Sequence, residues 1–483
     1  MKKKSRFHSG PNGTQFGTQQ QRLLHSLALT RSKEMTSAFQ RALALHQAGR
    51  LTEAEAIYGQ ILKVEPNHFD ASHLLGVIYY QRGTHADAVR QIDAALKVNS
   101  KFADAHANRG NALLKLGSSD EALVSYDKAL ALTPNKAETI SNRGFALYEL
   151  KRFDEALASY ERALALQPEH AGAHWNEALL RLLKGDFGRG WAKHEWRWAN
   201  KNLALKKRNF AQPLWLGSDA IANKTILLYS EQGFGDTIQF CRYVPLVAER
   251  NARVILEVPS SLHGLMCSLA GPTQTVSYGS PLPHFDFQCP LLTLPLAFGT
   301  RLETIPSATP YLRASADSLK NWRTRLGPRS RPRIGLVWSG SPTHTNDKVR
   351  SISLQSLQPL LDIDATFVSL QKDVRSDDAP LLKKYNDILD FGDLLKDFSD
   401  TAALISHLDL VISVDTSVAH VAGALAKPVW VLLPFVPDWR WLLDRDDNPW
   451  YPTSRLFRQN RARDWDSVIM RVREALLKFV KYL

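Results

Sequence analysis

The sequence VISVDTSVAHVAGALAKPVWVLL spans residues 411–433 and contains two apolar runs separated by a polar turn and an alanine-rich stretch. The runs at 411–414 and 429–433 have the length and apolar character of buried strands. The turn at 415–417 consists of Asp, Thr and Ser, residue types that favour the start of a helix. We therefore predict a strand, a helix and a second strand of a parallel sheet.

The polar turn is also the natural place for an anionic ligand. Backbone N–H groups and the positive end of the helix dipole converge where a helix begins, and they stabilise a phosphate there. His420 follows one helical turn later. A second strand–turn–helix pattern, ILLYSEQGFGDTI, occupies residues 226–238. Two such units predict a cleft that holds a nucleotide diphosphate between them.

Short apolar runs alternate with helical stretches from about residue 213 onward. The runs lie at 225–229, 253–258, 285–289, 333–338, 366–370, 408–414 and 428–433. Such alternation predicts βαβ units and parallel sheets. The stretch at 315–332 is polar and arginine-rich. We therefore expect two Rossmann-like halves, at 213–314 and 333–483, joined by the linker 315–332.

Residues 35–170 contain an internal repeat with a period of 34 residues. The positions that recur are Ala54, Ala88, Ala122 and Ala156; Pro66, Ser100, Pro134 and Pro168; and Gly76, Gly110 and Gly144. Small residues allow two helices to approach closely, and tyrosines at 58, 126 and 160 fill the space between them. This period is that of the tetratricopeptide repeat, so four helix pairs forming an α-solenoid are predicted.

The segments on either side of the repeats are less regular. Residues 1–34 are basic and polar, and we expect a disordered tail there. Residues 171–212 begin with a degenerate fifth unit and continue into a linker rich in tryptophan. A terminal repeat has to close the solenoid, so Trp191, Trp196 and Trp198 are expected to seal it against the next domain.

Composition restricts the class of protein. The 44% hydrophobic and 23% charged content of this 483-residue chain is typical of a soluble globular protein. No run has the roughly 20 apolar residues of a membrane span, although peripheral membrane association remains open. Three scattered cysteines fit reduced thiols and a cytoplasmic location. The net charge of +13 is not accompanied by a nucleic-acid-binding motif, so no nucleic-acid partner is expected.

Four motifs carry a resemblance to known glycosyltransferases: GFGDTI at 233–238, GLVWSG at 335–340, DKVRSI at 347–352 and VDTSVAHVAGAL at 414–425. From residue 233 to about 463 the chain resembles the two-Rossmann GT-B class, particularly its lipopolysaccharide heptosyltransferase-like branch. Repeats joined to such a module are also similar in architecture to protein O-GlcNAc transferase. The full layout resembles a bacterial family of repeat-fused glycosyltransferases.

The resemblance implies an inverting transfer from a nucleotide sugar, without a metal or another cofactor. The first half would then face the acceptor and the second half the donor. Asp236 matches the acidic residue that the family uses as a base, although it would equally suit a helix cap. Gly233 and Gly235 would allow close approach of a substrate or simply form a tight turn.

The resemblance places the donor contacts mainly in the second half. Asp415, Thr416 and His420 match the family pattern Asp-Thr-Gly-x-x-His, in which Ser417 here replaces the glycine. The remaining donor candidates are Ser339 in the phosphate loop, Arg350 (or Lys348 beside it) as the basic residue, and Lys372. The competing interpretations are an ordinary helix cap at 415–417, a packed His420 and solvated loop charges.

Three functions are compatible with these observations. The first is a glycosyltransferase whose repeats recruit a protein or peptide acceptor for O-glycosylation. The second is transfer to lipopolysaccharide or another cell-surface glycan. The third is a non-catalytic repeat scaffold on a transferase fold that has lost its activity.

Overall fold

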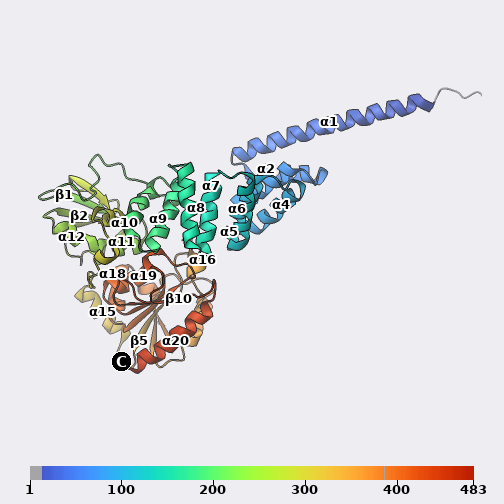
Figure 1. Ribbon diagram of the computed structural model, residues 1–483. Helices are drawn as coiled ribbons and strands as arrows, with labels where there is room; N and C mark the ends of the chain where they lie inside the picture. Colours follow the sequence, from blue (N-terminus) through green and yellow to red (C-terminus); the bar gives the residue numbers. More distant parts are fainter. Residues whose placement is uncertain (1–12, 386, 483) are drawn as a thin grey trace, which may run out of the picture. The chain divides into compact units, whose positions relative to one another are not determined.

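The computed structural model describes residues 13–385 and 387–482 (Figure 1). The chain divides after His170 into two compact units. The first consists of helices, whereas the second contains two parallel sheets with their covering helices. The described helices include none long and apolar enough to cross a membrane.

Helices of the first unit pack in sequence, each against the next. They are α1 (Gly13–Gln47), α2 (Leu51–Val64), α3 (Phe69–Gln81), α4 (His85–Val98), α5 (Ala103–Leu116), α6 (Ser119–Leu132), α7 (Ala137–Glu149) and α8 (Phe153–Leu166). Figure 1 shows α5 to α8 standing side by side. The predicted helical repeats are therefore confirmed.

The repeated glycines allow neighbouring helices to approach closely, as their spacing predicted. A Cβ atom on Gly110 would lie 2.7 Å from the ring of Tyr126, and one on Gly144 would lie 2.7 Å from the ring of Tyr160. Both tyrosine side chains are at most 1% exposed. The glycines at the turns, Gly83 among them, have positive φ angles that other residues rarely adopt.

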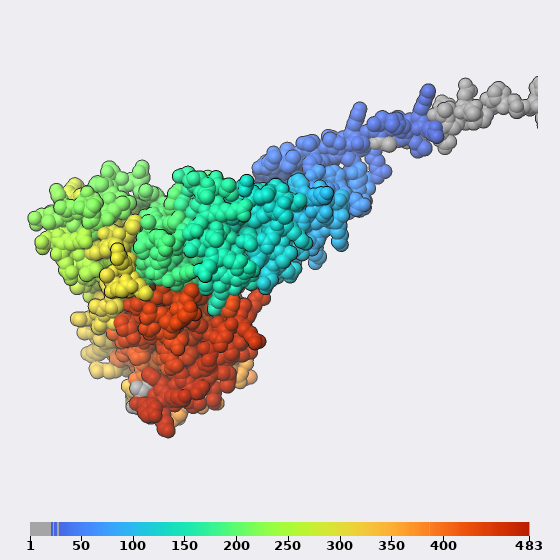
Figure 2. All heavy atoms as spheres, viewed as in Figure 1, coloured from blue at the N-terminus to red at the C-terminus, as the bar shows by residue number. Residues whose placement is uncertain are grey.

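The N-terminal segment differs from the prediction. Residues 13–34, expected to be disordered, form the first part of α1, and residues 1–12 lie outside the described range. From residue 21 to 34 the described side chains are exposed, and Figure 2 shows the blue end of α1 clear of the other helices of its unit. Glutamine, leucine, alanine and arginine are good helix formers, which explains a helix here without a packed face.

The second unit begins with the degenerate repeat, α9 (Ala171–Leu183) and α10 (Phe187–His194). Trp191 is buried, its indole N–H donates to the Thr300 carbonyl at 3.1 Å, and its ring contacts Trp439 at 5.3 Å. Trp196 instead stacks on His174 at 4.0 Å. Of the three predicted tryptophans, Trp191 thus makes the seal to the α/β region.

A four-stranded parallel sheet follows, with the strand order β3-β2-β1-β4. Its strands are β1 (Thr225–Tyr229), β2 (Arg253–Val258), β3 (Pro272–Ser277) and β4 (Phe287–Pro290). Its helices are α11 (Phe234–Phe240), α12 (Val244–Ala248), α13 (Ser260–Met266) and α14 (Leu294–Ala297). Strand β1 pairs with both β2 and β4, so α11 begins above the point where the strand order reverses.

A six-stranded parallel sheet forms the C-terminal part, with the order β10-β9-β8-β5-β6-β7. Its strands are β5 (Arg333–Val337), β6 (Thr366–Ser369), β7 (Ile388–Asp390), β8 (Leu410–Val414), β9 (Val429–Leu433) and β10 (Ser454–Arg458). Its helices are α15 (Ala316–Leu326), α16 (Asp347–Arg350), α17 (Ala379–Lys384), α18 (Phe398–Ser406), α19 (Ser417–Ala424) and α20 (Trp465–Lys481). The predicted parallel-sheet α/β architecture is confirmed.

The segment predicted as a linker, 315–332, is largely helical. It contains α15, whose Trp322 is fully buried and donates its indole N–H to Asp400 of α18 at 3.0 Å. The linker is therefore packed against the C-terminal sheet region. Its arginine-rich end at 327–332 leads directly into β5.

Candidate functional site

The order of the C-terminal sheet determines where a ligand is expected. Strand β5 pairs with β6 on one side and with β8 on the other, so the chain reverses direction across the sheet there. Ligands of open parallel sheets bind beyond the carboxyl ends of the strands at such a point. Ser339 follows β5, and the turn 415–417 follows β8. The two predicted phosphate-binding segments thus end on neighbouring strands.

Arg350 connects these two segments. Its Nη1 donates to the Asp415 carbonyl at 2.9 Å. Its guanidinium also lies against Gly340, where a Cβ atom would stand only 2.5 Å from Nη2. The Arg350 Nε is buried and has no hydrogen-bond partner in the described part of the chain. A cation with a free donor therefore stands at the reversal point of the sheet.

The start of α19 lacks a side-chain cap. Thr416 is the N-cap residue, but its side chain does not cap the helix and instead contacts the Ser413 hydroxyl at 3.1 Å. Ser417 is the first helical residue. On the neighbouring strand end, the Ser339 hydroxyl is buried and has no partner among the described residues. Helix N–H groups and a hydroxyl donor are both available for phosphate oxygens.

His420 lies deeper in the site than the sequence indicated. It is 4% exposed, and its Nδ1 is 2.9 Å from the Tyr451 hydroxyl. Burial lowers the pKa of His420, and the nearby Arg440 lowers it further, so its imidazole is neutral at pH 7. The His420 ring is thus packed in the structure, and its contact with a donor stays a prediction.

Gly235 allows helix α11 to approach α19. A Cβ atom at this position would lie 2.8 Å from Cδ2 of His420 and 3.7 Å from the Cα atom of Ser417. The glycine is thus explained by helix packing rather than by a tight turn. This contact also brings the 233–238 motif next to the 415–420 motif.

Replacing Gly235 by alanine is expected to lower the free energy of unfolding by about 1–3 kcal/mol, because the added methyl group overpacks the buried His420 ring. Denaturant unfolding measures the change. Gly188→Ala is the matched control, since a Cβ atom there meets no atom within 4 Å. Equal stability of the two variants would contradict the packing role of Gly235.

Both oxygens of Asp236 have partners. One accepts the backbone N–H of Gly233 at 2.9 Å, which caps α11, and the other forms an ion pair with Arg440. Arg440 also binds Asp438 at 2.8 Å and lies over the Trp439 ring at 4.3 Å. Asp236 therefore caps α11 and pairs with Arg440, while its role as a base stays a prediction.

Sequence reasoning missed three charged residues of this site: Glu231, Asp438 and Arg440. Arg440 and Asp438 belong to the aromatic loop after β9, in which Trp439 and Trp441 are buried. The signal for Glu231 was its place two residues after β1, in the same motif as Asp236. Arg440 and its partner Asp236 are 204 residues apart in the sequence, so only the fold brings them together.

Glu231 is a buried carboxyl group next to the reversal point of the first sheet. Its side chain is 4% exposed, and Oε1 accepts from Arg197 at 3.1 Å and from the Leu292 N–H at 3.2 Å. Oε2 is buried without a partner among the described residues. Burial raises the pKa of Glu231 to about 7, against the opposing effect of Arg197. Such a group can exchange a proton near neutral pH.

This raised pKa predicts a pH-dependent stability. Between about pH 4.5 and 7 the unfolded chain loses the Glu231 proton while the folded chain keeps it, so stability falls as the pH rises. Relative to Glu231→Gln, the wild type should lose up to about 3 kcal/mol from pH 4 to pH 8. Denaturant unfolding of both proteins at several pH values measures this difference. A constant difference would show that the carboxyl group titrates normally.

Lys372 does not join the other candidates. It follows β6, is exposed, and its Nζ donates to the Lys396 carbonyl at 3.1 Å. Lys348 is likewise exposed, whereas Arg350 on the same short helix α16 points to Asp415. Of the two basic residues at 348 and 350, Arg350 is therefore the one placed to contact a ligand.

Carboxyl groups lie close to the donor-binding candidates. Burial raises the pKa of Asp415, and the neighbouring Asp438 raises it further, whereas Arg350 opposes the shift. Asp236 and Asp438 share Arg440. The site thus combines two arginines, several carboxyl groups and an uncapped helix start. Such a set can bind a diphosphate and accept a proton.

Comparisons with known proteins identify matches in both the repeat region and the C-terminal α/β region. The family described as Glycosyltransferase family 9 (heptosyltransferase) matches residues 396–432, which include β8 and α19. Tetratricopeptide repeat families match residues 45–111, 110–151 and 137–170. The chain thus contains these repeats and a segment similar to family 9 glycosyltransferases.

Protein FlbA of Caulobacter vibrioides is 24% identical over 329 residues, which are 62% of this chain and 54% of FlbA. This chain therefore spans about half the length of that curated relative. Among solved structures, MamA is similar to 36% of this chain over its whole length (22% identity, TM-score 0.32). YrrB, described as a TPR protein with an unusual peptide-binding site, covers 37% of this chain with 94% of its own (23% identity, TM-score 0.32).

Proposed function

We propose that the second unit is a nucleotide-sugar-dependent glycosyltransferase of the GT-B type. The observation that carries the proposal is the convergence of Arg350, the Ser339 hydroxyl and the uncapped start of α19 at the reversal point between β5 and β8. The similarity of residues 396–432 to family 9 glycosyltransferases supports it independently. The diphosphate of the donor would bind to these three elements.

The reaction would proceed as a direct displacement with inversion. The acceptor oxygen forms a bond to the anomeric carbon while the bond from that carbon to the donor phosphate breaks. Asp236 would take the acceptor proton, and Arg440 would orient its carboxylate. The electron pair of the broken bond leaves with the nucleoside diphosphate, whose added charge Arg350 and the α19 N–H groups would stabilise. These protein groups perform the step without a metal or another cofactor.

The acceptor would be a protein or peptide bound by the repeats. Tetratricopeptide repeats form extended binding surfaces, and residues 45–170 match repeat families. We place the reaction in the cytoplasm, in agreement with three cysteines that are all free thiols. No nucleic-acid partner is part of the proposal. Contact with a membrane surface would be peripheral.

Transfer assays with radiolabelled nucleotide sugars test this function. The purified full chain is incubated with each donor and with cell lysate, and label is then followed into protein and lipid fractions. Label on protein that depends on Arg350 supports the proposal. Label in the lipid fraction would instead assign the acceptor to lipopolysaccharide or another surface glycan. A folded chain that transfers no label to either fraction would be a scaffold.

A further inference from the structure

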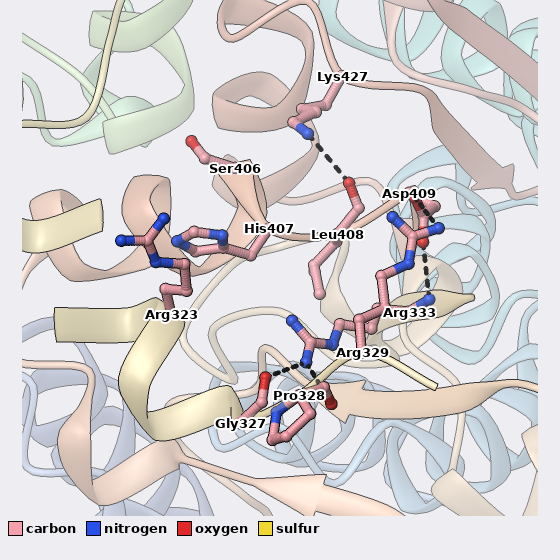
Figure 3. A pocket seen from close by; sticks show the side chains of 10 residues that line it. All are labelled: Arg323, Gly327, Pro328, Arg329, Arg333, Ser406, His407, Leu408, Asp409 and Lys427. Carbon is pink, nitrogen blue, oxygen red and sulfur yellow. Dashed lines mark hydrogen bonds and ion pairs between the residues drawn. The ribbon is translucent and has the colours of Figure 1, made fainter. Parts of the chain in front are cut away.

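A charged pocket lies at the amino ends of the strands of the C-terminal sheet, opposite the proposed donor site. It has a volume of about 470 Å³ and is lined by residues from three loops at the amino ends of β5, β8 and β9 (Figure 3). The lining residues are Arg323, Gly327, Pro328, Arg329, Arg333, Ser406, His407, Leu408, Asp409 and Lys427. The proposed donor site lies at the carboxyl ends of the same strands. The two sites are therefore distinct.

Positive charge exceeds negative charge in this pocket. Its lining contains four arginine and lysine residues but one carboxylate, Asp409. Asp409 is already used twice: one oxygen binds Arg329 at 3.1 Å, and the other accepts the Arg333 backbone N–H at 2.8 Å. The remaining cations have carbonyl oxygens as partners or, for Arg323, no ion pair among the described residues.

One of these cations is buried and another is half-buried. Arg333 is 6% exposed, and its Nη2 contacts the carbonyls of residues 326, 327 and 328, which fixes the wall of the pocket. Lys427 is half-buried and donates to the Leu408 carbonyl at 3.1 Å. Burial lowers the pKa of both groups and Arg329 lowers it further, whereas Asp409 opposes the shift in each case. Cations held this way are stabilised by an added anion.

We propose that this pocket binds a small phosphorylated ligand with more than one negative charge. Arg323, Arg329 and Lys427 would contact the phosphate, and Arg333 would hold the loop around it. Figure 3 shows these side chains on separate segments, with Lys427 above Leu408, Arg329 beside Asp409 and Arg323 beside His407. The volume falls within the range of small-molecule sites, roughly 300–1,000 Å³. Basic residues gathered around one pocket, rather than along an extended stripe, favour a small ligand over nucleic acid. The inference does not depend on the proposed transferase activity.

Inorganic pyrophosphate is the probe for this site. Titration calorimetry of the full chain at constant ionic strength gives its affinity, and hydrogen–deuterium exchange locates it. We expect slower exchange in the segments 323–333 and 406–409. The double variant Arg329→Gln/Lys427→Met should bind at least about tenfold more weakly and lose that protection. Arg323→Gln, an exposed substitution, should weaken binding without affecting folding.

Arg331→Gln is the matched control. Arg331 lies in the same basic segment but pairs with Asp364 and does not line the pocket. This variant should bind pyrophosphate like the wild type. Equal weakening by Arg331→Gln and Arg323→Gln would reduce the effect to general surface charge and overturn the proposal. So would pyrophosphate that protects only residues 410–420, or that shows no saturable binding.

Discussion

Replacing Asp236 by asparagine is expected to lower the rate of sugar transfer by about 10²–10⁴-fold, because the amide cannot accept the acceptor proton. Donor affinity should stay within about twofold of the wild type, since Asp236 lies on α11 and the proposed phosphate contacts lie on α16 and α19. Single-turnover transfer assays and donor titration measure the two quantities separately.

The asparagine variant keeps one of the two contacts of Asp236. Its amide oxygen can still accept the Gly233 N–H, so the cap of α11 is retained, whereas the ion pair with Arg440 is lost. Asp317→Asn provides the control, because Asp317 is an exposed acid in the first turn of α15. If Asp236→Asn transfers sugar at the wild-type rate, Asp236 is only a helix cap. Glu231 would then be the next carboxyl group to examine.

Replacing Arg350 by alanine should weaken donor binding by about 10–100-fold, because a charge-assisted contact to the diphosphate is lost. The rate of transfer should also fall, since the leaving diphosphate gains charge in the transition state. Titration with the donor measures the first effect, and turnover at saturating donor measures the second.

Lys348→Ala separates a specific contact from a general loss of charge. Lys348 lies on the same short helix and carries the same charge, but it is exposed. Its removal should change donor affinity by less than about threefold. Equal losses in the two variants would show that the basic segment acts only through its overall charge. Thermal unfolding of Arg350→Ala checks that the lost Asp415 contact has not unfolded the loop.

The fold was largely predictable because its signals are periodic. The 34-residue spacing of the alanines and glycines reflects helix contacts that recur in each repeat, such as Gly110 against Tyr126. Buried parallel strands are continuous apolar runs, so β8 and β9 were visible in 411–433. The start of α1 was not predicted, because its exposed residues lack an amphipathic pattern and only helix propensity favours it.

The site was predictable only where its residues are close in sequence. Asp415, Thr416, Ser417 and His420 share one strand–helix unit, and their placement follows from it. The partner of Asp236 could not be found this way, because Arg440 comes from a loop of the other sheet region. The hydrogen bond from Arg197 to Glu231 likewise links the segment after the degenerate repeat to the loop that follows β1. These contacts depend on tertiary packing that no local pattern records.

The binding position of a nucleoside diphosphate is the decisive measurement. A thermal-shift screen of uridine, guanosine, adenosine and thymidine diphosphates would select the best ligand, and a crystal structure of its complex would locate it. We expect the diphosphate to contact the Arg350 guanidinium and the N–H groups at the start of α19. The proposed function would be contradicted by a diphosphate that binds instead in the pocket lined by Arg323 and Arg329, with side chains filling the space beyond the carboxyl ends of β5 and β8.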